Sequence, residues 1–223
     1  MVSLWNHPPP PFKVLSKLAH LISGIFSPLT LPVLGISGIL FWGESADIYI
    51  ARSYYVWLIL ATILLFTFIF PFIILYSAKL MGIIESWDLR KQSERPLMYL
   101  LGIVFLTFTC RYFMQIPLLS AIFPATVIGG AVVLGMCLCL NFFFKISVHG
   151  ASCGALFGVF ILGSFITHSD LWLLTSLAAL ISGLVGFSRL YLGEHTPFQF
   201  YTGWGVGILA QIIGMIGFYY FFF

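Results

Sequence analysis

Long apolar stretches alternate with short polar segments along nearly the whole chain. Seven stretches are apolar enough to be membrane spans, at about residues 29–42, 54–76, 97–114, 118–144, 150–166, 171–187 and 200–223. Most of them are near the roughly 20 residues that a helix needs to cross about 30 Å of hydrocarbon. Pro28 and Pro32 interrupt or kink the start of the first stretch. The pattern therefore predicts an all-α, polytopic membrane bundle of six or seven transmembrane spans.

The N-terminal segment has a different pattern from the rest of the chain. Residues 8–11 are a run of prolines, which favours an extended segment outside the membrane. Residues 12–26 place two lysines and a histidine among Leu and Ile at helical spacing, which is typical of a helix lying in the membrane interface. We therefore expect a Pro-rich and interfacial segment over residues 1–28, followed by one transmembrane domain over residues 29–223.

Three polar segments interrupt the apolar stretches, at residues 79–96, 145–149 and 188–199. Two predicted spans separate the first segment from the second, and two more separate the second from the third. An even number of crossings returns the chain to the same side, so all three segments are expected at one end of the bundle. Polar groups at such a boundary are costly unless they are solvated or paired, and they often mark function.

Composition excludes several classes of protein. The chain is 61% hydrophobic and only 8% charged, whereas soluble domains contain about 25% charged residues. We expect an integral, multi-pass protein of a bacterial-type inner or plasma membrane. The net charge of +3 gives no sign of nucleic-acid binding. The four cysteines lie in or beside apolar runs, and no Cys/His spacing suits zinc, so neither a metal nor another cofactor is expected.

The three polar segments contain the residue types that phosphoryl transfer requires. An arginine side chain binds phosphate oxygens through two parallel N–H groups and spreads charge in the transition state. A neutral imidazole can attack phosphorus, and a second histidine can protonate the leaving alkoxide. The candidate residues are Arg90, Lys91 and Arg95 in the first segment, Ser147 and His149 in the second, and Arg189 and His195 in the third.

Spacing within the three segments adds to this picture. Residues 188–195 read Ser-Arg, five residues and His, residues 146–149 read Ile-Ser-Val-His, and residues 95–96 read Arg-Pro. In this order they resemble the three signatures of the type 2 phosphatidic acid phosphatases, membrane enzymes related to vanadium haloperoxidases. The second signature of that family reads Pro-Ser-Gly-His, and its first has Lys where this chain has Asp88.

The resemblance implies a role for each matched residue. His195 is expected to be the nucleophile, forming a phospho-histidine, and His149 the general acid. Arg95, Arg189 and Ser147 would hold phosphate oxygens. The implied reaction is hydrolysis of a lipid phosphate or a polyprenyl diphosphate without a metal, and the expected partners are that substrate and membrane lipids.

Two positions depart from the family pattern. Gln199 stands where the family has the Asp that orients the nucleophilic histidine. A Gln carbonyl accepts the ring N–H and fixes the tautomer, but it supplies no charge to stabilise an imidazolium. Polyprenyl-diphosphate phosphatases related to this family are similar in carrying Gln there. Asp88 replaces the family Lys, and Arg90 or Lys91 would take its place from the next helical turn.

Two other functions fit parts of the sequence. Residues 150–154 read Gly-Ala-Ser-Cys-Gly, which contains the Gly-x-Ser-x-Gly pattern of a serine nucleophile and resembles the serine region of rhomboid intramembrane proteases. Ser152 and His195 would then form a catalytic dyad. Small-residue runs in membrane helices are more often packing surfaces. The third possibility is a non-catalytic lipid-binding or transport bundle that uses the same cationic face.

Overall fold

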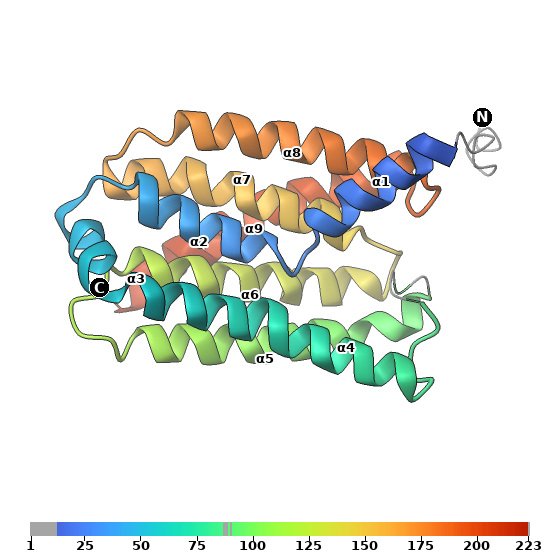
Figure 1. Cartoon of the computed structure of the whole chain (residues 1–223), viewed down its shortest axis with the longest axis horizontal. Helices are drawn as coiled ribbons and strands as arrows, with labels where there is room; N and C mark the ends of the chain where they lie inside the picture. Colours follow the sequence, from blue (N-terminus) through green and yellow to red (C-terminus); the bar gives the residue numbers. More distant parts are fainter. Residues whose placement is uncertain (1–12, 87–88, 90, 223) are drawn as a thin grey trace.

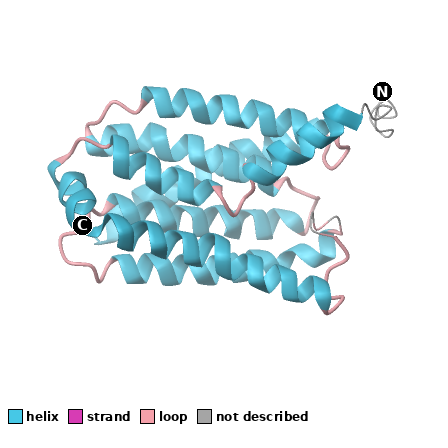
Figure 2. Cartoon of the chain, viewed as in Figure 1, coloured by secondary structure: helices cyan, strands magenta, loops and turns pink. Residues whose placement is uncertain are grey.

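The computed structural model describes residues 13–86, 89 and 91–222, and all regular structure within them is helical (Figures 1 and 2). In chain order the elements are α1 (Lys13–Ile25), α2 (Leu31–Trp42), α3 (Ala46–Leu64), the π-helical turn η2 (Leu65–Ile69), α4 (Phe70–Leu80), the 3₁₀ turn η3 (Gln92–Glu94), α5 (Arg95–Phe113), α6 (Ile122–Asn141), α7 (Val148–Thr167), α8 (Trp172–Tyr191) and α9 (Pro197–Phe222). The predicted all-helical membrane bundle is confirmed. The proline run at residues 8–11 lies outside the described residues.

Six helices of the described chain are long and apolar enough to cross a membrane. The predicted first span, residues 29–42, is instead the 12-residue helix α2. At 1.5 Å per residue this helix is about 18 Å long, which is shorter than the hydrocarbon core. The described residues thus form a multi-pass membrane protein with six long spans and one short apolar helix.

The first long span begins earlier than the apolar pattern predicted, at Ala46 rather than at residue 54. Its first turns contain Asp47 and Arg52, which lowered the apparent hydropathy of this region. Both charged side chains have partners in the fold, since Ser120 donates to the Asp47 carboxylate and Arg52 donates to the carbonyl oxygen of Phe41. A helix can therefore continue through a segment that the hydrophobic pattern alone left out.

The same span contains a π-helical turn at its middle. Helix α3 continues through η2 into α4, and Pro71 lies at the start of α4. Proline has no backbone N–H and its ring clashes with the carbonyl one turn earlier, so the helix must adjust its hydrogen bonds there. Single π-helical turns inside α-helices occur frequently at functional sites. The π-helical turn also faces the interior of the bundle, because its residue Thr67 is buried.

Helices α7 and α9 pack against each other at unusually short range. Gly150 and Gly154 on α7 face the backbone of α9, and Gly203 and Gly207 on α9 face the backbone of α7. A Cβ atom at any of the four would overlap a carbonyl oxygen of the opposite helix. Small residues spaced by four allow such close approach in membrane helices. The Gly-x-Ser-x-Gly pattern is therefore part of a packing surface.

The three polar segments lie together at one end of the bundle, on the right in Figure 1. The start of α7 and the start of α9 are joined there by a backbone hydrogen bond from Ser147 N–H to the Gln199 carbonyl oxygen at 3.2 Å. Helices α1 and α2 together carry the chain from this end to the other, although α2 alone is short. For the described residues of 79–96, 145–149 and 188–199 the predicted convergence is confirmed, since Arg95 donates to the Ile146 carbonyl and Lys145 to the Glu194 carbonyl.

Candidate functional site

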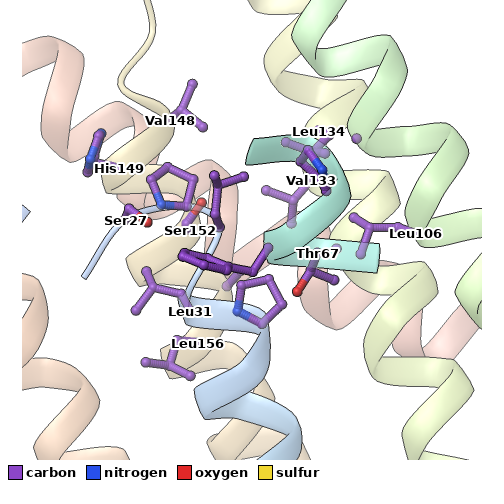
Figure 3. A pocket seen from close by; sticks show the side chains of 18 of the residues that line it. Ser27, Leu31, Thr67, Leu106, Val133, Leu134, Val148, His149, Ser152 and Leu156 are labelled. Atoms are coloured by element: carbon purple, nitrogen blue, oxygen red, sulfur yellow. The ribbon is translucent and has the colours of Figure 1, made fainter. Parts of the chain in front are cut away.

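A cavity of about 590 Å³ lies between the helices and reaches the end of the bundle where the polar segments meet. Four of the sequence-predicted residues line its polar end: Arg95, His149, Arg189 and His195. Its remaining wall is mostly apolar, with Leu31, Leu106 and Leu156 among the side chains that Figure 3 shows. The cavity therefore has a cationic, imidazole-containing end and a long hydrophobic interior.

The orientation of His195 follows from its hydrogen bonds. Its Nδ1 lies 3.1 Å from Oε1 of Gln199, and the backbone N–H of Thr196 donates to the same oxygen at 3.1 Å. Since a backbone N–H requires an acceptor, the contacting atom of Gln199 is its carbonyl oxygen, and Nδ1 of His195 must carry the ring proton. Nε2 of His195 then has a free lone pair. Gln199 itself does not line the cavity.

His195 is held in its neutral form. The residue is only 7% exposed, and it lies in the turn between α8 and α9. Burial lowers its pKa to about 3, and the positive charges of Arg95 and Arg189 act in the same direction. The hydrogen bond to Gln199 opposes the decrease without cancelling it. At neutral pH His195 is therefore an unprotonated imidazole with its nucleophilic nitrogen available.

His149 lies in the first turn of α7, and its contacts include helix α1. Nε2 of His149 lies 3.4 Å from Oγ of Ser23, and Nη1 of Arg189 donates to the same hydroxyl at 3.0 Å. Ser23 is buried and thus bridges a histidine and an arginine that the sequence had placed in one site. The sequence does not single out Ser23, because nothing distinguishes it from the other polar residues of an amphipathic helix. The expected boundary at residue 28 divides the site, because α1 contributes to it.

Arg189 and Glu194 are both buried, and neither is an exposed interfacial group. Their charged atoms, Nη2 and Oε2, lie 3.9 Å apart. Lys145 donates from Nζ to the backbone carbonyl of Glu194 at 3.1 Å, so a second cation reaches the same turn. Sequence analysis gave Glu194 no role, and the structure makes it the carboxylate beside the site's arginine. Positive charge still exceeds negative charge there, which favours an anionic ligand.

Arg95 is fixed by backbone acceptors. Its Nε donates to the Leu89 carbonyl oxygen at 2.9 Å and its Nη1 donates to the Ile146 carbonyl oxygen at 2.7 Å. Ser147, which follows Ile146 in the chain, caps α7 because its hydroxyl oxygen accepts the Gly150 N–H at 3.2 Å. Ser147 is fully buried and does not line the cavity. In this structure it therefore supports the helix that carries His149.

The other predicted cations are Arg90 and Lys91, of which the structure describes only Lys91. Arg90 and Asp88 lie outside the described residues. The side chain of Lys91 is 55% exposed and forms an ion pair with Glu85, whose hydrogen bond raises the Lys91 pKa. Lys91 is absent from the cavity lining, so the structure does not bring it to the histidines. The carboxylate of Glu85 neutralises the charge of Lys91 at the surface instead.

The geometry does not assemble the alternative serine dyad. Ser152 lines the cavity one turn along α7 from His149 (Figure 3). Within the described part of the chain no hydrogen bond joins Ser152 to His149 or to His195. Over the same residues, no three His, Cys, Asp or Glu side chains are grouped closely enough to hold a metal ion.

Fold and site together define a multi-pass membrane protein with an amphipathic internal cavity that ends in histidines and arginines. A comparison with models of known protein families finds no match. Searches of the curated proteins and of the solved structures find no similar protein either.

Proposed function

We propose that this protein is a membrane phosphatase that hydrolyses a lipid phosphate or a polyprenyl diphosphate through a phospho-histidine. One observation carries the proposal: a single cavity joins His149, His195 and two buried arginines to a long apolar chamber. The resemblance of residues 95–96, 146–149 and 188–195 to the phosphatidic acid phosphatase signatures supports it independently. The membrane is proposed to be a bacterial-type inner or plasma membrane.

The first half of the reaction uses the neutral His195. A phosphate group held by the guanidinium groups of Arg95 and Arg189 presents its phosphorus to Nε2 of His195. Nε2 donates its lone pair to phosphorus, and the bond from phosphorus to the leaving oxygen breaks. His149, protonated beside the bound dianion, transfers its proton to that oxygen. The products are phospho-His195, neutral His149 and the released lipid.

The second half of the reaction reverses the proton transfer. Neutral His149 accepts a proton from a water molecule, and the water oxygen attacks phosphorus. The bond between phosphorus and Nε2 breaks, which returns the lone pair to His195 and releases inorganic phosphate. Gln199 keeps the proton on Nδ1 throughout both steps, because its carbonyl oxygen accepts that N–H. The orientation needed for attack is thus preserved without a negative charge at residue 199.

The apolar chamber supports a lipid as the substrate. Cavities of roughly 300–1,000 Å³ hold small-molecule ligands, and the volume of about 590 Å³ lies in this range. The lining includes the α1–α2 linker at Ser27 and Pro28 and the half-exposed Phe72 of α4. A chain in the chamber would lie among apolar side chains while its phosphate stays with the arginines at the end of the bundle.

Phosphate release from a lipid panel tests the proposal. Purified protein in detergent micelles is given phosphatidic acid, alkyl phosphates, and polyprenyl mono- and diphosphates. His195→Ala should abolish release from every lipid that the wild type hydrolyses, and vanadate should inhibit the wild type. The matched control is His168→Asn, which alters an exposed histidine in the α7–α8 turn and should leave release unchanged.

Three outcomes would reject the proposal in whole or in part. Equal phosphate release by the wild type and by His195→Ala would show that His195 is not the nucleophile and would reject the phospho-histidine mechanism. Binding of these lipids without release of phosphate from any of them would favour the lipid-binding bundle. Covalent labelling of Ser152 by a fluorophosphonate would instead support the serine hydrolase.

A further inference from the structure

Helix α1 carries a row of basic side chains that the reaction described above does not use. Lys13, Lys17 and His20 are all exposed, and their spacing of four and three residues places them on one face of the helix. Helix α1 contains no acidic residue, and neither lysine forms an ion pair with any described residue. This basic row therefore presents positive charge at the end of the bundle where the polar segments meet (Figure 1).

The other faces of α1 show how the helix is held. Ala19 and Ser23 are buried, and α1 packs mainly against α8. A second row of exposed side chains is apolar and has the same spacing: Val14, Leu18, Leu21 and Ile25. An exposed apolar row beside a basic row is typical of a helix that lies among lipid headgroups with its apolar side chains toward the acyl chains. This pattern places the basic row at the level of the lipid phosphate groups.

The basic row leads to the cavity. His20 lines the cavity, and so does Gly24, one turn further along the same face. Among the described residues of the lining, these two and Phe72 of α4 are the exposed ones. A Cβ atom at Gly24 would meet no other atom within 4 Å. The cavity therefore reaches the surface beside the inner end of the basic row.

One helical turn separates the basic row from the arginines. Ser23, three residues after His20, lies 3.4 Å from Nε2 of His149 and accepts a hydrogen bond from Arg189 at 3.0 Å. Residues three apart on a helix have Cβ atoms about 5–6 Å from each other. A lipid phosphate at Lys17 and His20 would thus lie close to the site, with its chains beside the opening of the apolar cavity.

We propose that Lys13, Lys17 and His20 bind the phosphate group of an anionic membrane lipid and hold that lipid at the opening of the cavity. The ligand class is lipids whose phosphate headgroup has a net negative charge. Each lysine near such headgroups strengthens binding about fivefold. The claim that the held lipid goes on to be the substrate rests on the proposed function, but binding itself can be measured without turnover.

Binding of phosphatidylglycerol tests the basic row. This lipid is anionic and its phosphate is a diester, so binding is separate from phosphate release. Purified protein in a neutral detergent is titrated with dioleoyl phosphatidylglycerol or with zwitterionic dioleoyl phosphatidylcholine, and bound lipid is measured by native mass spectrometry. Lys17→Gln should bind phosphatidylglycerol about fivefold more weakly, and the double variant Lys13→Gln/Lys17→Gln about 25-fold more weakly. Binding of phosphatidylcholine should not change.

Matched variants separate the basic row from general effects of charge. Lys17→Arg keeps the positive charge and should bind as the wild type does. Lys91→Gln removes a lysine at the same end of the bundle that is paired with Glu85, and it should not weaken binding. His20→Asn should weaken binding, whereas His168→Asn alters an exposed histidine in the α7–α8 turn and should not.

Several results would overturn the proposal. Equal effects of Lys17→Gln and Lys91→Gln would show that only the net charge of the protein matters. Equal losses for phosphatidylglycerol and phosphatidylcholine would show that α1 holds lipid by apolar contact alone. Displacement of phosphatidylglycerol by an equal concentration of inorganic phosphate would identify a site for free anions and reject the lipid.

Phosphate release from dioleoyl phosphatidic acid is measured in parallel. Lys17→Gln should raise KM and leave kcat unchanged, because the basic row holds the lipid without touching the reacting phosphate. A lower kcat at unchanged KM would reject this role. Charge-dependent lipid binding without any phosphate release by the wild type would reject the phosphatase and retain the lipid site. Normal release with unchanged lipid binding in the lysine variants would do the reverse.

Discussion

The charge at residue 199 should control the protonation of His195, and Gln199→Glu isolates that effect. Glu has the length of Gln, so a carboxylate oxygen can accept both the His195 Nδ1–H and the Thr196 N–H that Gln199 accepts at 3.1 Å. The surrounding Arg95, Arg189 and Lys145 favour the ionised carboxylate. The substitution therefore preserves the hydrogen bonds and adds one negative charge beside the imidazole.

The magnitude follows from Coulomb's law. Opposite unit charges about 4 Å apart attract by about 4 kcal/mol at an effective dielectric constant of about 20. A pKa change of one is worth about 1.4 kcal/mol, so this attraction raises the His195 pKa by about three, from about 3 to about 6. The pKa of His195 rises, because a carboxylate stabilises the protonated ring. At pH 5 the variant imidazole is then protonated, whereas the wild-type imidazole is neutral.

Two measurements follow this change independently of each other. Nuclear magnetic resonance of protein labelled with ¹⁵N-histidine gives the His195 titration between pH 4 and 9, with His195→Ala supplying the assignment. The rate of phosphate release in the wild type should show no loss from protonation of free His195 above about pH 4, and in Gln199→Glu it should fall below about pH 6. A wild-type His195 that titrates near pH 6.5 would refute the argument from burial. An unchanged titration in the variant would refute the hydrogen bond to residue 199.

Three other predictions address the supports of the site. Ser23→Ala removes the hydroxyl that joins α1 to the arginine and the histidine, and phosphate release should fall about tenfold, equivalent to about 1.4 kcal/mol, with faster hydrogen exchange in α1. Gly154→Val should lower the thermal unfolding temperature in micelles, because α7 and α9 must separate, whereas Gly183→Ala on α8 has open space and should not. Lys91→Ala should leave phosphate release unchanged, while Arg95→Ala should reduce it at least a hundredfold; equal effects of the two would contradict the assignment of Arg95 to the phosphate.

The contribution of the sequence differs between the residues of the site. His149, Arg189 and His195 were predicted together from the type and spacing of residues and from the number of crossings between them, and they line one cavity. Lys91 was predicted from its place in the chain, one turn from the expected lysine position. The structure pairs it with Glu85 at the surface. Position along a loop does not specify the direction in which a long side chain points, so the sequence could not exclude Lys91 from the site.

The supporting residues were harder to predict. Ser23 lies far from the other site residues in sequence, and its role depends on α1 packing against the end of α8. Glu194 was visible beside His195, but its burial next to Arg189 depends on the fold of the turn. A carboxylate or hydroxyl acquires such a role from its neighbours in space, and a sequence read alone does not contain those neighbours.

Hydrophobic length and the parity of crossings are properties of the chain taken in order. The sequence by itself therefore determined that this is a helical membrane protein and that its three polar segments meet at one end. The rotation of each helix about its axis, and the glycine contacts that press α7 against α9, were decided only by tertiary packing. Those rotations direct side chains either into the cavity or away from it. For that physical reason the set of side chains that line the cavity emerges only from the folded structure.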